Sequence, residues 1–210
     1  MAIICPTVLA KNPHNFRTQV ERVSSLCNRL QIDLSDGLFT PDKTVEVSQV
    51  WWPEGIFADV HLMYKNPNEE IDRLVKLKPS LVIVHAEADG NFIEFAEKLH
   101  SENIRVGVAI LPETSVNTLK PAANNIDHVL IFAGHLGYFG GEADLTQTKK
   151  VSDIKQLNSS IEIGWDGGIN DKNIGQIVKA GVDVLNVGSY IQHAADPVKA
   201  YARLMAVAED

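Results

Sequence analysis

Eight short runs of β-favouring residues alternate with amphipathic segments along the whole chain of 210 residues. The runs, each of which contains Val or Ile, are residues 2–6, 30–33, 57–62, 81–86, 106–111, 128–133, 161–165 and 182–188. Apolar residues recur at helical spacing in the segments between them, at residues 15–26, 68–77, 91–102, 146–157, 173–181 and 196–208. The segments near residues 43–52 and 115–125 are less regular. Strands that alternate with helices are typical of a parallel sheet covered by helices.

A closed parallel barrel is the most economical fold for this α/β pattern. Eight strand–helix pairs without a long linker predict a (β/α)8 TIM barrel, with residues 1–210 forming one domain. Such barrels typically have about 250 residues. Apolar residues make up 45% of the chain, which is enough for a full core. A doubly wound open sheet is the alternative, but no G-x-G-x-x-G motif follows the first run.

Composition and charge limit the kinds of binding partner and the cellular location that we expect for this protein. The net charge of −8 leaves no basic footprint for nucleic acid or for an anionic membrane surface. Cys5 and Cys27 are too few for a disulfide framework and lack the spacing of a metal site. The N-terminal stretch MAIICPTVLAKN does not have the pattern of a signal peptide, and no apolar run approaches the ~20 residues of a membrane span. We therefore expect a cytoplasmic protein.

Polar residues and glycines gather where the expected strands end. In a parallel barrel, these C-terminal ends form the rim that carries the active site. The residues are Thr7, Gln31, Asp33, Asp36, His61, Met63, His85, Glu87, Pro112, the loop GHLGYFGGE at 134–142, Asp166, Gly167, Gly168, Gly188 and Ser189. Because Asp36 precedes Gly37, the pair is more typical of a turn than of chemistry.

Asp33, His61 and Asp166 are the strongest candidates for chemistry. Strand alternation points all three into the barrel mouth, where an unpaired carboxylate is costly. None of the expected strand ends offers a lysine or arginine partner, so a functional role is favoured. Two carboxylates and an imidazole suit a divalent transition metal. Two carboxylates on opposite walls also suit a base and an acid that act on the two faces of one substrate carbon, and the two roles are compatible. For His85, support of the site and contact with substrate are equally favoured.

Three glycine-rich turns follow the sixth, seventh and eighth expected strands. They read GYFGGE, DGGIN and VGSY. Glycines allow backbone N–H groups to approach an anion closely, and phosphate sites in these barrels often use the loops after strands seven and eight. The three turns therefore predict a small phosphorylated substrate.

Several motifs together resemble those of a known family. CPTVLA, QIDLSDGLFTPD, DVHLMYKNP, VHAEA, FGGE, WDGGIN and VGS fall in the order and spacing found in ribulose-phosphate 3-epimerases. The resemblance covers nearly the whole chain. It implies a TIM barrel of the ribulose-phosphate-binding type and a soluble homo-oligomer, dimeric or larger. It also implies interconversion of ribulose 5-phosphate and xylulose 5-phosphate by movement of one proton at C3.

The resemblance also implies roles for single residues. Asp33 and Asp166 match the acid/base carboxylates of the family, and with His61 they match ligands of one divalent metal ion such as Zn, Fe or Mn. His61 would also line the substrate site, and Thr7 stands where the family has a substrate-contacting serine. The residues that match the phosphate-binding turns are Gly140, Gly141, Gly167, Gly168, Gly188 and Ser189.

The chain departs from the family pattern at residues that line the expected site. Gln31 occupies the position of the fourth metal ligand, which is a histidine in the family. An amide oxygen is a weaker and harder donor than imidazole, so the metal would be held loosely, would be a harder ion, or would not be bound. Ser35 and Phe132 occupy positions where the family has methionines. A sugar-phosphate binder without activity is therefore an alternative function. A lyase or decarboxylase is less favoured, because no expected strand contains the lysine that Schiff-base chemistry needs.

Overall fold

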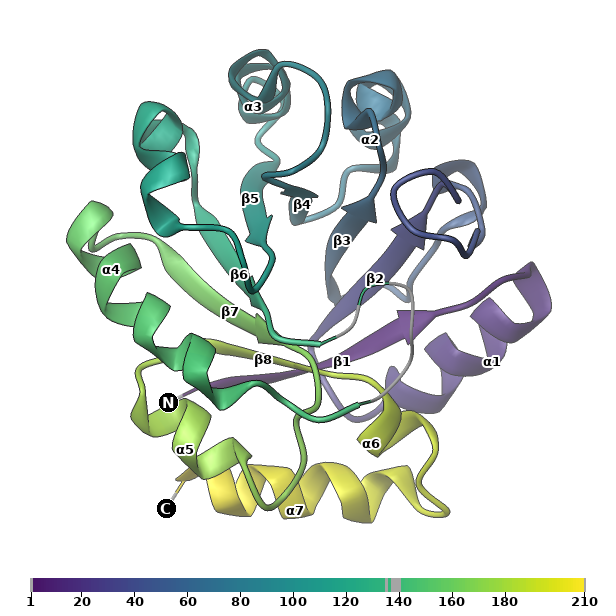
Figure 1. The fold of residues 1–210 in the computed structure, drawn as a ribbon. Coiled ribbons are helices and arrows are strands. Elements are labelled where there is room, and N and C mark those ends of the chain that lie inside the picture. Colours follow the sequence, from purple (N-terminus) through teal and green to yellow (C-terminus); the bar gives the residue numbers. More distant parts are fainter. Residues whose placement is uncertain (1, 135, 137–140, 210) are drawn as a thin grey trace.

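The computed structural model describes residues 2–134, 136 and 141–209, and its eight parallel strands form a closed barrel in chain order. The strands are β1 Ile3–Leu9, β2 Arg29–Ser35, β3 Phe57–Met63, β4 Leu81–His85, β5 Arg105–Ile110, β6 His128–Phe132, β7 Glu162–Asp166 and β8 Val184–Val187. Helices surround the strands (Figure 1). The prediction of a (β/α)8 barrel is confirmed.

Seven α-helices and four 3₁₀ segments lie between and after the strands within the described residues. The helices are α1 Pro13–Val23, α2 Ile71–Leu77, α3 Phe92–His100, α4 Lys150–Leu157, α5 Ile174–Lys179, α6 Ser189–Gln192 and α7 Pro197–Glu209. The 3₁₀ segments are η1 Val47–Gln49, η2 Pro67–Glu70, η3 Val116–Asn125 and η4 Leu145–Lys149. The two connections that lacked helical regularity in the sequence contain only η1 and η3. Pro121 lies inside η3, where its missing N–H is incompatible with a continuous α-helix.

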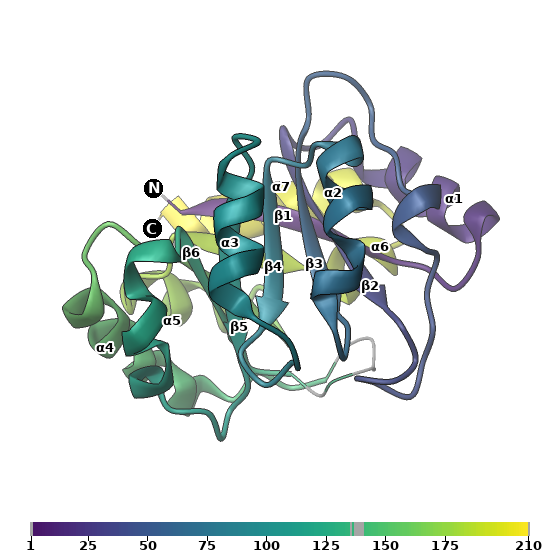
Figure 2. The ribbon, with the colours of Figure 1, turned by 90° about the horizontal axis from the view of Figure 1, so that it is seen from above.

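The strand register fixes which side chains are neighbours at the mouth. Asp33 of β2 pairs with His61 of β3, and Gln31 pairs with Thr7 of β1. Asp166 of β7 pairs with Phe132 of β6. Because all the strands are parallel, their C-terminal ends lie at one end of the barrel, and the connections to the helices begin there (Figure 2).

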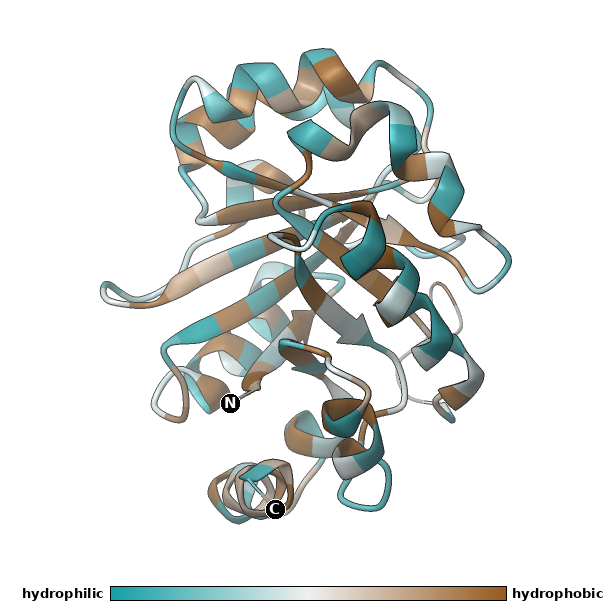
Figure 3. Ribbon diagram, turned by 90° about the vertical axis from the view of Figure 1, so that its left-hand side faces the viewer, coloured by the Kyte–Doolittle hydropathy of each residue, from teal (hydrophilic) through white to brown (hydrophobic). Residues whose placement is uncertain are grey.

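Most of the core lies between the barrel and the helices. Trp165, Phe16 and Phe95 are among the largest fully buried side chains of this layer. Figure 3 shows hydrophobic stretches along the strands and alternating hydrophobic and polar bands on the helices. The barrel interior holds a separate apolar cluster formed by Leu81, Ile83, Ala109 and Leu130. Toward the mouth the interior also carries buried polar side chains, among them Gln31, Asp33 and His61, and the site is built in this part.

A charge cluster closes the opposite, N-terminal end of the barrel. The guanidinium of Arg29 donates to Asp59 at 2.8 Å and through two N–H groups to Glu162 at 2.9 Å. His128 Nδ1 also lies 2.9 Å from Glu162. Burial opposes ionisation of Glu162, but the hydrogen bonds from Arg29 and His128 outweigh it and hold the pKa of this carboxyl far below its usual range. The cluster joins β2, β3, β6 and β7 and lies away from the mouth.

The described helices are short. No helix within residues 2–134, 136 and 141–209 is long and apolar enough to span a bilayer.

Candidate active site

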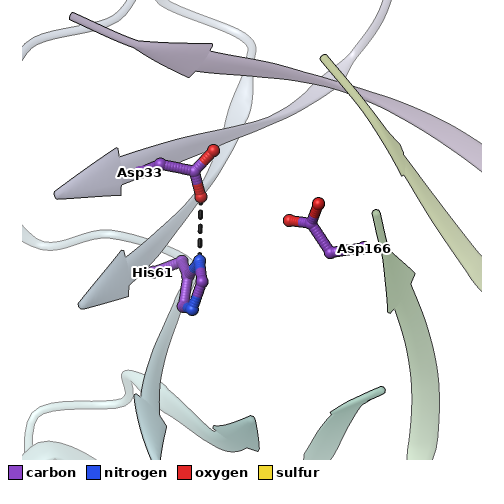
Figure 4. Close-up of side chains that lie close together, drawn as sticks. All are labelled: Asp33, His61 and Asp166. Carbon is purple, nitrogen blue, oxygen red and sulfur yellow. Dashed lines mark hydrogen bonds and ion pairs between the residues drawn. The ribbon is translucent and has the colours of Figure 1, made fainter. Parts of the chain in front are cut away.

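Asp33, His61 and Asp166 come together at the mouth of the barrel. Each offers one possible ligand atom, and these atoms lie within 4.8 Å of one another. His61 Nδ1 is 2.9 Å from Asp33 Oδ1. Figure 4 shows Asp33 and His61 on adjacent strands, with the Asp166 carboxylate facing them from the other side of the mouth. Asp33 and His61 are buried, with 9% and 1% of their surface exposed, and Asp166 is partly exposed.

Gln31 links the two carboxylates. Its Nε2 donates to Asp33 Oδ1 at 2.8 Å and to Asp166 Oδ2 at 2.6 Å. The side chain is fully buried, and its Oε1 has no hydrogen-bond partner in the described part of the chain. In this arrangement the amide presents N–H groups to the carboxylates, so it does not offer a lone pair to a metal between them.

The surroundings of Asp166 favour its protonated form. Burial is the main cause, the neighbouring Asp33 carboxylate adds to it, and together they raise the pKa of Asp166 to about 7. His61 and the hydrogen bond from Gln31 act in the opposite direction but do not prevail. A carboxyl group that exchanges its proton near neutral pH is suited to acid/base work.

A second imidazole stands behind His61. His85 Nε2 lies 2.9 Å from His61 Nε2. Burial lowers the pKa of His85 to about 4, so this imidazole is neutral. If His61 donates from Nδ1 to Asp33, its Nε2 accepts, and His85 must donate from Nε2. The Nδ1 of His85 then carries no proton toward Glu87, which lies 3.5 Å away. His85 is thus in hydrogen-bond contact with His61.

Aromatic rings line this side of the site. The Phe39 ring centroid lies 4.8 Å from that of His85, and the Phe132 ring centroid lies 6.3 Å from that of His61. Glu87 is held in turn by the backbone N–H of Leu111 at 3.1 Å and by the hydroxyl of Thr114. The two histidines therefore sit in an apolar wall with a fixed orientation.

The turn after β7 packs directly on the loop after β6. Gly167 and Gly168 have φ angles of +121° and +66°, which favour glycine. A Cβ on Gly167 would overlap the backbone of Gly134, and one on Gly168 would overlap the backbone of Ala143. The seventh-strand turn predicted to bind phosphate is thus a close backbone-to-backbone junction.

The other predicted binding residues are placed as follows. Gly188 and Ser189 directly follow β8, and β8 pairs with β7 through Asn186 and Asp166. Gly141 is among the described residues and has a φ of +117°, whereas Gly140 lies outside them. Thr7 is buried beside Gln31 in the register of β1 and β2.

Asp36 has a structural role at the rim, as its position before glycine indicated. Its Oδ1 accepts the backbone N–H groups of Leu38 at 2.7 Å and Phe39 at 2.9 Å, and its Oδ2 accepts that of Lys65 at 2.7 Å. These contacts tie the loop after β2 to the end of β3.

Comparison with known proteins identifies the family. A model of the ribulose-phosphate 3 epimerase family matches residues 3–192. The chain belongs to this family. The ribulose-phosphate 3-epimerase of Helicobacter pylori strain J99 is 31% identical over 201 residues, which cover 92% of each chain. The enzyme of the same name from Mycobacterium leprae is 31% identical over 212 residues, which cover 96% of this chain and 93% of that one. The resemblance inferred from the motifs is confirmed.

Solved structures share the barrel of this epimerase-family chain. A 3-hexulose-6-phosphate synthase superposes with a TM-score of 0.75 at 19% identity, covering 98% of this chain and 99% of that chain. A 3-keto-L-gulonate-6-phosphate decarboxylase from Vibrio cholerae superposes with a TM-score of 0.71 at 13% identity, covering 99% and 97%. These similarities show the fold.

Two features of the site were not predicted from the sequence. The period-two pattern of β2 predicted that Gln31 and Asp33 share a face, but it did not show that the amide also reaches Asp166, 135 positions away in the chain. The His61–His85 contact was also missed, although both histidines end neighbouring strands with the same parity. That shared parity is the signal that could have revealed it.

Proposed function

We propose that this chain is an isomerase that inverts C3 of a ketose phosphate, with ribulose 5-phosphate and xylulose 5-phosphate, or a close analogue, as substrate and product. The observation that supports this most strongly is the pair of carboxylates from β2 and β7, held at the mouth by a single amide nitrogen. Membership of the epimerase family supports the reaction type, and the names of the relatives supply the substrate class.

In this proposal, Asp33 and Asp166 move one proton between them and C3. One carboxylate removes the C3 proton from one face, and the other returns a proton to the opposite face of the enediolate, which inverts the centre. The roles exchange in the reverse direction, so both groups must carry a proton in turn. The raised pKa of Asp166 suits it to hold that proton at neutral pH.

The same residues fit a divalent metal ion. Two carboxylate oxygens and an imidazole nitrogen within 4.8 Å of one another form a donor set that suits Zn, Fe or Mn. Asp33, His61 and Asp166 would hold the ion, which would supply Lewis-acid stabilisation of the enediolate oxygens. His85 would keep the ring of His61 oriented for this role.

We further propose that the glycine turns after β6, β7 and β8 bind the phosphate through backbone N–H groups. Support comes from the packing of Gly168 on Ala143 and from the pairing of β7 with β8, which bring the three turns to one side of the mouth. Gly141, Gly167, Gly188 and Ser189 complete the proposed set, and Thr7 would contact the sugar.

Hydrogen exchange at C3 tests the proposed function. Ribulose 5-phosphate is incubated with the protein in D₂O, with and without added Zn²⁺, Mn²⁺ or Fe²⁺, and deuterium at C3 is followed by NMR. We expect exchange in the wild type and its loss in Asp33→Asn and Asp166→Asn. Asp42→Asn is a matched control, because Asp42 is a half-buried carboxylate of the loop after β2, paired with Lys11 at 2.9 Å. Normal epimerisation by either site variant would refute the proposed roles.

A sugar-phosphate binder without turnover is the second candidate function. The observation that favours it is the position of Gln31, which stands where the family has a histidine and donates hydrogen bonds to both carboxylates. Saturable binding of ribulose 5-phosphate without C3 exchange under any metal condition would support this candidate. A lyase is less favoured, because none of the eight described strands contains a lysine.

The homo-oligomer implied by the resemblance stays a prediction.

A further inference from the structure

The amide of Gln31 uses both of its N–H groups on the two carboxylates of the site. One group donates to Asp33 at 2.8 Å and the other to Asp166 at 2.6 Å. The side chain is fully buried inside the barrel, where it lies between Thr7 on β1 and Asp59 on β3 in the strand register. A single neutral group therefore connects two acidic side chains from opposite sides of the mouth.

The orientation of this amide depends on what it faces. An amide has a donor end and an acceptor end of opposite polarity. If Oε1 faced Asp33 and Asp166 with both carboxylates ionised, three oxygens would meet in a buried site without a hydrogen between them, which is unfavourable. The N–H₂ end is therefore the one that stabilises the two carboxylates in the absence of a cation. A cation held by Asp33, His61 and Asp166 would need the lone pairs that these N–H groups now occupy.

We propose that Gln31 acts as a neutral substitute for a metal ion between the two carboxylates. Its amide holds Asp33 and Asp166 in place in the metal-free protein, and it competes with a divalent cation for the same carboxylate lone pairs. Organisation of the site is then independent of metal, and metal affinity is lower than a histidine at this position would give. This inference rests on the proposed use of the two carboxylates as the working groups of the site, but it does not depend on turnover.

The substitution Gln31→Met distinguishes a Gln31 that competes with the cation from a Gln31 that ligates it, because the two roles predict opposite changes in Zn²⁺ affinity. Gln31→Met keeps the length of the side chain but removes both the N–H donors and the amide oxygen. If Gln31 competes with the cation, metal-free Gln31→Met is less stable than wild type and binds Zn²⁺ more tightly. We expect a gain of about tenfold or more, which is the equivalent of losing one charge-assisted hydrogen bond on metal entry. If Gln31 is an ordinary ligand through Oε1, the same variant binds Zn²⁺ more weakly.

The experiment compares wild type, Gln31→Met, Gln31→His and Gln147→Met. Gln147 is a buried glutamine outside the carboxylate site, with its Nε2 on Asp144 at 2.8 Å, so its variant controls for the loss of a buried amide. Each protein is stripped with a chelator, and its Tm is measured with and without Zn²⁺. The Zn²⁺ dissociation constant is measured by competition with a chromophoric chelator.

We expect Gln31→His to bind Zn²⁺ at least tenfold more tightly than wild type and to melt lower than wild type after chelation. At a fixed excess of metal, each tenfold gain in affinity adds about 3–5 °C to the metal-induced rise in Tm. Gln147→Met should match the wild-type Zn²⁺ affinity.

Weaker Zn²⁺ binding by Gln31→Met than by wild type would overturn the proposal. A wild-type Tm that falls on chelation as much as that of Gln31→His would also overturn it. If Gln31→Met does not fold, the fall in Tm on chelation decides the question, because competition predicts a smaller fall for wild type than for Gln31→His. Absence of C3 exchange would refute the proposed function and leave this inference standing, because neither Tm nor Zn²⁺ affinity requires turnover.

Discussion

Replacing Arg29 with methionine removes the central cation of the cluster at the N-terminal end of the barrel. Arg29 and Asp59 are only 8% and 2% exposed, and their side chains meet at 2.8 Å. Methionine keeps most of the length and the apolar stem of arginine but has none of its N–H donors. The substitution therefore leaves the Asp59 carboxylate buried without its principal partner.

The expected cost follows from that uncompensated charge. Removing one partner of a buried ion pair costs about 3–5 kcal/mol. Glu162 contributes less to this loss, because it keeps contacts with His128 at 2.9 Å and Arg105 at 3.2 Å. We expect the free energy of unfolding at pH 7.5 to fall by about 3–5 kcal/mol. For a protein of this size, the Tm should drop by about 6–20 °C.

Urea unfolding followed by circular dichroism measures this change. Arg105→Met is the matched control, because Arg105 binds the same Glu162 from a half-exposed position, and we expect a loss of at most about 1 kcal/mol. Arg29→Met should also approach wild type as the pH falls toward 4. Burial already raises the pKa of Asp59 beside Arg29, and loss of the guanidinium would raise it further, so protonation at low pH removes the buried charge. A loss below about 1 kcal/mol for Arg29→Met, or a difference independent of pH, would refute this reasoning.

Three further predictions concern the mouth of the barrel. The pKa of Asp166 is raised to about 7, so between about pH 4 and 7 the folded protein keeps a proton that the unfolded chain has released. The free energy of unfolding should therefore fall as the pH rises from about 4 to 7. Urea titrations of Asp166→Asn should lack this decline, and an equal decline in both proteins would contradict the assignment. Gly168→Ala should raise the KM for ribulose 5-phosphate at least tenfold, since its φ is +66° and its Cβ would overlap Ala143; an unchanged KM would remove this turn from the phosphate site. His85→Phe should lower kcat by about tenfold to a hundredfold with little change in KM, because His61 loses its Nε2 partner; an unchanged kcat would show that this contact does not matter.

The strands could be predicted from the sequence because a strand that is buried on both faces forms a nearly continuous apolar run. Runs such as 57–62 and 81–86 contain enough β-branched and apolar residues to be recognised without knowledge of their neighbours, and they match β3 and β4 to within one residue. The connections η1 and η3 could not be predicted in the same way. A capping box between Glu46 and Gln49 defines η1, and Pro121 lies inside η3, so neither segment has the regular spacing of a long α-helix.

The composition of the candidate site was also accessible from sequence, because strand parity and the position of strand ends are local properties. Residues 31 and 33 share a face of β2 by alternation alone, and parallel strands of a barrel expose their C-terminal ends on one rim. The sequence alone therefore predicts that Asp33, His61, Asp166 and the glycine turns lie at one mouth.

The contacts among the side chains at the mouth depend on closure of the barrel. Closure brings β2 and β7 together so that one Gln31 nitrogen reaches Asp33 and Asp166, although Gln31 and Asp166 are 135 positions apart. The direction of that amide, the contact of His61 with His85 and the raised pKa of Asp166 all depend on distances of a few ångströms between distant segments. Hydrogen bonding and desolvation vary steeply over such distances, whereas strand period depends only on neighbours in the chain. The sequence alone therefore determined which side chains face the mouth, and the tertiary structure determined which of them contact one another there.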